Sequence, residues 1–232
     1  MPNILAGAEA PLQAVIFDFD GVLVESMAIK SDCFRQLFSD RAEVGRIVAL
    51  HERHGGVDRR TKIAMIYREI LNEPLTPGEL DRLAQRFEAF VEERVATCDM
   101  VPGARDLLDC LNGRLPMVVA SGTPQGELER IADRRGLSQY FVSLRGSPPD
   151  KTALVTDILE QGRWNPHQVL MIGDAMTDFE AARENGLQFI GRQMPSQHVA
   201  FPLGTRLVPD LVELAGAAIE LYAAKSVTTG AL

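Results

Sequence analysis

Two carboxylates one residue apart follow an apolar run near the start of this 232-residue chain. The run covers residues 14–17, and Asp18 and Asp20 come directly after it, just before Gly21. A short apolar run that ends at a turn signal predicts a buried parallel strand, and ligands bind beyond the carboxyl ends of such strands. If the strand continued, both side chains could reach one ligand, and the backbone between them could add a carbonyl. Because Mg²⁺ is held by one or two carboxylates with phosphate oxygens, this stretch is a candidate Mg²⁺ site.

Three later segments supply the other groups that phosphoryl transfer needs. Ser121, Gly122 and the threonine after them precede a proline, so we expect a hydroxyl and N–H groups to hold a phosphate at a helix N-terminus. Lys151 is predicted to open another helix, where its charge can neutralise a phosphoryl group. Asp174 ends a further apolar run and is a natural metal ligand. Asp178, in the next helical turn, could bind the metal or orient Asp174.

The elements predicted around these groups alternate between strands and helices. Apolar strands are expected at 116–120, near 141–144, at 169–172 and near 189, with helices between them. Such alternation implies a parallel sheet that is covered on both faces. From Ser26 to Asp99 the period is helical throughout, and Thr76 followed by a proline begins one of these helices. The tail after Tyr222 has a weak pattern and is expected to fray.

We therefore expect an α/β protein with two domains. A Rossmann-like, doubly wound core is predicted for residues 1–25 and 100–232. An all-helical cap domain is predicted for residues 26–99, inserted after the first strand. The insertion is too long for an ordinary crossover, because a whole βαβ unit takes only about 30 residues.

Composition limits the partners that this chain can have. With 46% apolar residues it can bury a full core, and its net charge of −8 includes no dense run of Lys and Arg. Nucleic acid and anionic membrane surfaces are therefore not expected as partners. The three cysteines have no metal-ligand spacing, which indicates free thiols in a reducing compartment. No secretory signal or long apolar span is found, so we expect a cytoplasmic protein.

The motifs together resemble the haloacid dehalogenase superfamily, in its magnesium-dependent phosphatase branch with an α-helical cap of the C1 type. They are Asp18-Phe19-Asp20-Gly21-Val22-Leu23, Ser121-Gly122-Thr123, Lys151, and Gly173-Asp174 with Asp178. The resemblance implies that Asp18 is a nucleophile that forms an aspartyl phosphate and that Asp20 is the general acid and base. It also implies that Asp18, the Asp20 carbonyl and Asp174 hold Mg²⁺, and that Ser121, Gly122 and Lys151 bind the phosphate.

Two positions depart from the family pattern. Glu25 stands where many relatives carry an aspartate before the serine, at the exit towards the cap. The proline that often follows the motif lysine is missing after Lys151. Lys151 remains the best candidate because no other lysine lies between the second and fourth motifs.

A glycine-broken, cation-rich loop lies in the predicted cap at residues 51–62. Such a loop could close over the core and contact the leaving group, and Arg59 and Lys62 are the candidate substrate contacts. A solvated helix face is an equally good interpretation of these two cations. His51 and His54 have no matching third ligand, so we expect no metal there.

The four motifs in order favour an enzyme, a Mg²⁺-dependent phosphomonoester hydrolase that acts on a small phosphorylated metabolite of the sugar-phosphate or phosphoglycolate type. A sugar phosphomutase, primed with a bisphosphate, would have the same core and stays open as an alternative. A receiver-type signalling module also uses strand-end aspartates and Mg²⁺. It has no helical insertion and needs no acid two residues after its phosphorylated aspartate, so it fits this sequence less well.

Overall fold

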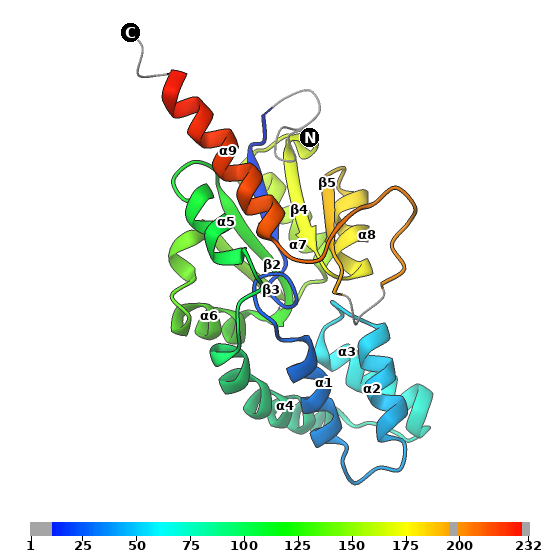
Figure 1. Ribbon diagram of the computed structural model, residues 1–232. Coiled ribbons are helices and arrows are strands. Elements are labelled where there is room, and N and C mark those ends of the chain that lie inside the picture. The colour runs from blue at the N-terminus through cyan, green and yellow to red at the C-terminus, as the bar shows by residue number, and fades with distance from the viewer. Residues whose placement is uncertain (1–10, 195–198, 229–232) are drawn as a thin grey trace.

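The computed structural model describes residues 11–194 and 199–228 and contains one six-stranded parallel sheet (Figure 1). The strand order is β3-β2-β1-β4-β5-β6, so the strand that precedes Asp18 lies at the centre, between β2 and β4. The strands are β1 (Ala14–Phe17), β2 (Met117–Pro124), β3 (Ser143–Ser147), β4 (Val169–Gly173), β5 (Gln188–Arg192) and β6 (Arg206–Val208). Because all run in one direction, the motif residues that follow β1, β2 and β4 come to the same edge.

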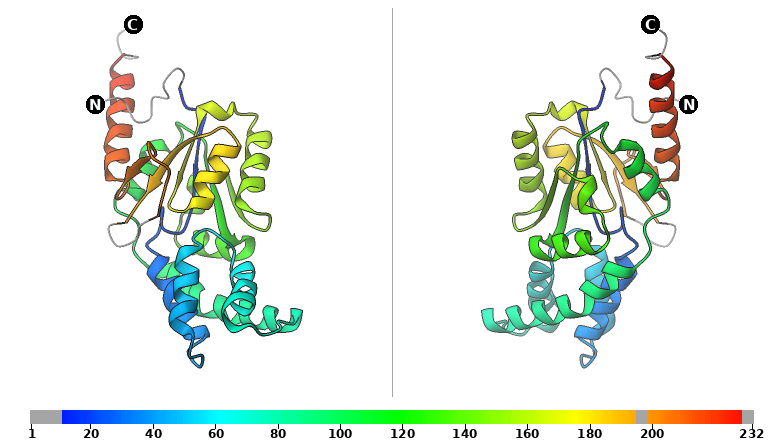
Figure 2. Two further views of the ribbon diagram at one scale, coloured as in Figure 1. Left: turned by 90° about the vertical axis from the view of Figure 1, so that its right-hand side faces the viewer. Right: turned by 90° about the vertical axis from the view of Figure 1, so that its left-hand side faces the viewer.

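Helices cover both faces of this sheet, as Figure 2 shows. One face packs against α5 (Ala104–Leu111), α6 (Gln125–Arg134) and α9 (Val212–Thr228), and the other against α7 (Lys151–Gly162) and α8 (Met176–Glu184). In β1, Val15 and Phe17 belong to the first core, whereas Ala14 and Ile16 belong to the second. This alternation places four fully buried side chains in two cores, and the expected doubly wound α/β fold is confirmed.

The helical insertion, here called the cap, lies between β1 and α5, below the carboxyl edge of the sheet in Figure 1. The helix predicted at Thr76 begins there, since the Thr76 side chain accepts a hydrogen bond from the Glu79 amide at 3.2 Å. Val24 pairs with Met100, so the chain enters and leaves the cap side by side. The cap helices are α1 (Met27–Leu37), α2 (Val44–Arg53), α3 (Arg59–Ile66), a π-helical turn (Tyr67–Leu71) and α4 (Pro77–Thr97).

The exact domain boundaries at 26 and 99 stay a prediction, and residues 1–10, 195–198 and 229–232 of the predicted core lie outside the described residues. Two short 3₁₀ turns, Ser138–Tyr140 and Pro166–Gln168, complete the core. The sequence reading missed β6, which has only three residues, and α9, whose buried positions include small alanines such as Ala215 and Ala218. The sequence predicts a frayed tail after Tyr222, whereas in the structure the backbone of α9 stays helical through Thr228.

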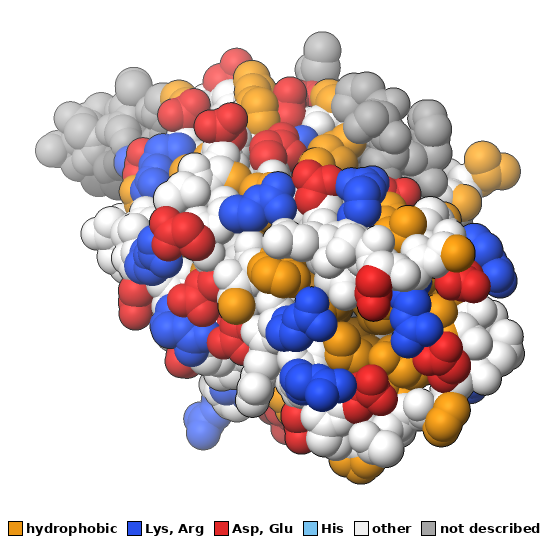
Figure 3. Space-filling model, turned by 90° about the horizontal axis from the view of Figure 1, so that it is seen from below, with side chains coloured by type: hydrophobic (Ala, Val, Ile, Leu, Met, Phe, Trp, Pro, Cys, Tyr) orange, Lys and Arg blue, Asp and Glu red, His pale blue; other side chains and the backbone are white. Residues whose placement is uncertain are grey.

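The underside of the cap carries charges of both signs, with Lys and Arg interspersed among Asp and Glu (Figure 3). Exposed ion pairs also join α6 of the core to α4 of the cap, as between Arg130 and Glu88 at 2.6 Å. Each such surface pair contributes at most about 1 kcal/mol, so they do little to fix the cap in place. Among the described residues, no helix combines the length and the apolar character needed to cross a bilayer.

Candidate active site

A sharp turn after β1 separates the two motif carboxylates. The strand ends at Phe17, and Gly21 has a φ of 75°, a left-handed conformation that favours glycine. A Cβ atom at Gly21 would also lie 2.1 Å from Oδ2 of Asp174, so no side chain fits there. Because the chain leaves the strand, Asp18 and Asp20 have different partners. The expectation that a continued strand would place both side chains on one ligand is not met.

A buried carboxylate triad lies at this edge of the sheet. Asp18, Asp174 and Asp178 each offer an oxygen, and the three oxygens lie within 4.8 Å of one another. Lys151 contacts two of the three, with Nζ 2.9 Å from Oδ2 of Asp18 and 2.5 Å from Oδ1 of Asp178. Lys151, Asp174 and Asp178 therefore meet Asp18 as predicted.

The pKa values in the triad indicate an excess of negative charge. Burial raises the pKa of Asp18 to about 7, Lys151 opposes the rise, and Asp178 adds to it. Burial and the neighbouring Asp18 and Asp178 raise the pKa of Asp174 well above its usual value. One lysine cannot compensate three buried carboxylates. An all-oxygen donor set with uncompensated charge fits a hard divalent cation such as Mg²⁺.

Asp178 is held by the protein through both of its oxygens. Oδ2 accepts the backbone N–H groups of Asp174 at 3.2 Å and Ala175 at 2.9 Å, and Oδ1 accepts from Lys151. These bonds fix the backbone of the loop that presents Asp174. Of the two roles expected for Asp178, they favour orientation of Asp174 over direct metal binding.

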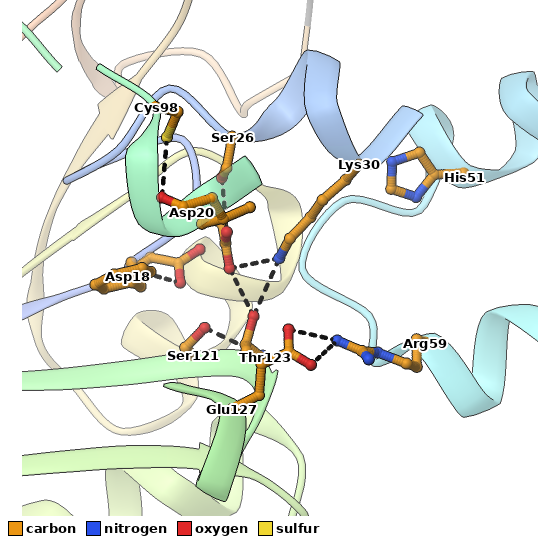
Figure 4. A network of polar contacts seen from close by, with 12 residues as sticks. Asp18, Asp20, Ser26, Lys30, His51, Arg59, Cys98, Ser121, Thr123 and Glu127 are labelled. Carbon is orange, nitrogen blue, oxygen red and sulfur yellow. Dashed lines mark hydrogen bonds and ion pairs between the residues drawn. The ribbon is translucent and has the colours of Figure 1, made fainter. Parts of the chain in front are cut away.

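Asp20 lies in a separate polar cluster that joins the core to the cap (Figure 4). Its carboxylate accepts hydrogen bonds from Ser26 at 2.6 Å and Thr123 at 2.7 Å, and Lys30 Nζ lies 2.5 Å away. Burial by itself raises the pKa of Asp20, but Lys30 and the two hydroxyls outweigh it and hold the pKa at about 2. Asp20 is thus ionised in this closed arrangement.

Sequence reasoning missed Lys30. It is half-buried on α1, and it also donates to Oγ1 of Thr123 at 3.0 Å. In the sequence it is a single cation on an amphipathic helix, where a solvated position is the usual reading. Its position ten residues after Asp20, in the first turn of the helix that follows the motif, is the only signal that the sequence offers.

Glu25, the first departure from the family pattern, has a structural partner. Its carboxylate accepts hydrogen bonds from both Nη atoms of the buried Arg192, at 2.6 and 3.0 Å. Nη1 of Arg192 also donates to the Gly21 carbonyl at 2.9 Å. Arg192 therefore ties the entrance of the cap to the turn that shapes the site. The longer glutamate reaches an arginine that ends β5.

The Ser121 segment differs from its prediction. Residues 121–124 continue β2, because Pro124 still pairs with Ser147 of β3, and α6 begins only at Gln125. The segment therefore belongs to the strand, but it still lies directly before Pro124, the N-cap of α6, as expected. Ser121 is fully buried and accepts a hydrogen bond from the Thr123 amide at 3.1 Å.

The cap loop packs directly on the core at Gly122. A Cβ atom there would lie 2.4 Å from the Gly56 carbonyl, so this contact requires glycine. The cap and the core together line a cavity of about 40 Å³. Core residues Asp18, Asp20, Ser121, Gly122, Thr123, Pro124 and Asp174 line it, together with Met27, Lys30, Phe34, His51, Gly56, Val57, Arg59, Lys62 and Phe87 of the cap segment.

Arg59 and Lys62 are buried in the cavity wall, with 7% and 4% of their surfaces exposed. The solvated-face interpretation is therefore wrong for both. Arg59 lies over the Phe87 ring and forms a buried ion pair with Glu127, from Nη2 to the two carboxylate oxygens at 2.6 and 2.5 Å. Lys62 Nζ lies 3.1 Å from Nδ1 of His51.

Glu127 and His51 were not predicted as site residues. In the sequence Glu127 is an acid in the first turn of a helix, where acids are common because they stabilise the helix N-terminus. In the sequence, the spacing of His51 from His54 draws attention to metal binding only. In the structure its ring stacks on Phe34, with the ring centroids 4.5 Å apart.

Replacing Lys62 by Met should stabilise the fold at neutral pH. Burial, with repulsion from Lys30, lowers the pKa of Lys62 from 10.5 to about 7. Between pH 10.5 and pH 7 the unfolded chain is protonated at Lys62 whereas the folded chain is not. Lys62 therefore lowers the free energy of unfolding in this range, and it does so more as the pH falls. We expect Lys62→Met to raise Tm by about 4 °C or more near pH 7.5 and by less near pH 9.5. Thermal unfolding at both pH values tests this, with exposed Arg60→Met as the control. An equal gain at both values would contradict it.

Comparisons with known proteins agree with this geometry. Residues 12–186 match the family model described as haloacid dehalogenase-like hydrolase. Phosphoglycolate phosphatase of Synechococcus elongatus is 28% identical over 179 residues, covering 76% of this chain and 81% of the relative. The phosphorylated carbohydrates phosphatase of Thermotoga maritima is 28% identical over 193 residues, covering 77% and 84%.

Solved structures share the fold. CbbY of Rhodobacter sphaeroides, crystallised with phosphate, has a TM-score of 0.72 at 18% identity and covers 88% of this chain and 96% of its own. A β-phosphoglucomutase of Clostridium difficile has a TM-score of 0.72 at 17% identity and covers 91% and 99%. The receiver-type alternative is not supported, because the family match and the helical insertion agree. The chain belongs to the haloacid dehalogenase-like hydrolase family.

Proposed function

We propose that this chain is a Mg²⁺-dependent phosphomonoester hydrolase that acts on a small phosphorylated metabolite, of the sugar-phosphate or phosphoglycolate type, through an aspartyl-phosphate intermediate. The observation that carries the proposal is the pairing of Asp18 with Lys151 beside Asp174, where Asp18 and Asp174 line the cavity between core and cap. The names of the phosphatase relatives support the same class of substrate.

In the first step an oxygen of Asp18 attacks phosphorus, and the bond from phosphorus to the ester oxygen breaks. Lys151 holds Oδ2 of Asp18, while the Phe19 amide donates to Oδ1 at 2.6 Å, so the carboxylate is oriented before substrate arrives. Asp20, which is ionised in the closed arrangement described above, first takes a proton from the phosphate monoanion or from solvent and then gives it to the departing alkoxide. Ser121 and Gly122 are proposed to bind the phosphoryl oxygens together with Lys151.

In the second step a water oxygen attacks phosphorus, its proton passes to Asp20, and the bond from phosphorus to Asp18 breaks. The ionised Asp20 described above is the form that accepts this proton. Asp18, the Asp20 carbonyl and Asp174 would hold Mg²⁺, with Asp174 oriented by Asp178. When bound, Mg²⁺ supplies the positive charge that lets a carboxylate approach a phosphate dianion.

Phosphate release from sugar phosphates, phosphoglycolate and nucleotides tests the proposal. We expect release with Mg²⁺ and none after treatment with EDTA, because three buried carboxylates would then repel the substrate. Activity should return when Mg²⁺ is added back. Hydrolysis that persists in EDTA, or a panel without any substrate, would contradict the proposed function.

A further inference from the structure

Unpartnered nitrogens gather on the cap side of the cavity. Among the described residues, four buried side-chain atoms have no hydrogen-bond partner, and three of them are Nε2 of His51 and Nε and Nη1 of Arg59. His51 and Arg59 both line the cavity and are more than nine-tenths buried. Buried polar groups are nearly always satisfied, so these atoms point to acceptors on a ligand.

The two unpartnered nitrogens of Arg59 are donors. The guanidinium has no acceptor, so both Arg59 atoms can only donate. Nδ1 of His51 lies 3.1 Å from Nζ of Lys62, and when Lys62 is protonated Nδ1 accepts from it and the ring hydrogen is on Nε2. This wall of the cavity therefore offers donors that suit oxygen acceptors of a leaving group.

The positive charge of Arg59 on this wall is largely cancelled. Both oxygens of Glu127 bind Nη2 of Arg59, and Glu127 is only 2% exposed, so an anion already lies against the guanidinium (Figure 4). Burial and the nearby Lys62 lower the pKa of His51 to about 2, which keeps its ring neutral. The Arg59 donors are present, whereas the guanidinium charge that would hold a dianion there is largely cancelled by Glu127.

We propose that Glu127 is a specificity-determining residue: it positions Arg59 for a leaving group whose oxygens carry at most one negative charge, and it disfavours a second phosphate dianion at this wall. The inference rests on the proposed function. A dianion on Nη1 would share one planar guanidinium with the Glu127 carboxylate, and like charges so close in a buried site repel strongly. A phosphomutase must hold a bisphosphate, so Glu127 favours hydrolysis over the mutase alternative.

Two unreactive probes of matched length test this proposal. Phosphonoacetate carries a carboxylate one carbon from its phosphonate, and methylenebisphosphonate carries a second phosphonate in the same place. Calorimetry in excess Mg²⁺ should show that the unmodified protein binds phosphonoacetate at least about tenfold more tightly. In Glu127→Gln we expect this ratio to fall by about tenfold. Exposed Glu129→Gln, on the same helix, should keep the original ratio.

Equal or tighter binding of methylenebisphosphonate by the unmodified protein would overturn the inference, and this measurement needs no variant to fold. An unchanged ratio in a folded Glu127→Gln protein would overturn it as well, since a merely structural role weakens both probes together. If the protein binds phosphonoacetate more tightly than methylenebisphosphonate but releases no phosphate from any ester, the result contradicts the proposed reaction and leaves the proposed role of Glu127 intact. The two failures are therefore distinguishable.

Discussion

Asp18→Asn should abolish phosphate release, with a loss of at least about 10⁴-fold in kcat. The amide has no anionic oxygen to attack phosphorus, and it is a poor ligand for Mg²⁺. The fold should survive, because an Asn oxygen can still accept the Phe19 amide and because one charge leaves an overcrowded carboxylate cluster. Steady-state kinetics on the best substrate of the panel gives the measurement.

A stability readout separates loss of chemistry from loss of structure. Added Mg²⁺ should raise Tm of the unmodified protein and raise that of Asp18→Asn much less, since a ligand that binds only the folded state stabilises it. Asp157→Asn, at a half-exposed position on α7 outside the four motifs, is the matched control and should keep both the activity and the Mg²⁺ response. More than a few per cent of turnover in a well-folded Asp18→Asn sample would remove Asp18 from the nucleophile role.

The sequence was sufficient to predict that Asp18, Lys151, Asp174 and Asp178 meet. Three of these residues follow apolar strands or open the next helix, and a parallel sheet places all such positions at one edge. The rule needs no knowledge of side-chain packing. It depends only on strand direction, which the alternation of strands and helices already determines.

Contacts across the closed cap could not be predicted in this way. Arg59 and Glu127 are 68 residues apart in the sequence. Their ion pair depends on how closely α3 of the cap approaches α6 of the core. Lys30 reaches Asp20 only when α1 has the observed orientation. Local patterns favour solvent for each of these charges, and only the tertiary packing buries them. The exact end of β2 could not be predicted for a related reason, because pairing with β3 extends the strand beyond the point where Thr123 and Pro124 suggest a helix.

Asp20→Asn should slow hydrolysis of an alkyl phosphate by about 10² to 10⁴-fold, because Asn can neither protonate the alkoxide nor take the proton of water. Ser26 and Thr123 can still hold the amide in place, so the side chain should keep its position while it loses its proton. A good leaving group needs no proton, and p-nitrophenyl phosphate should therefore lose much less in the first step. The ratio of the two losses is the informative quantity, since damage to the fold or to Mg²⁺ binding would slow both substrates alike. Equal losses of kcat/KM, which reports the first step alone, would mean that Asp20 does not assist the leaving group, and its buried contact with Lys30 would then serve only to close the cap.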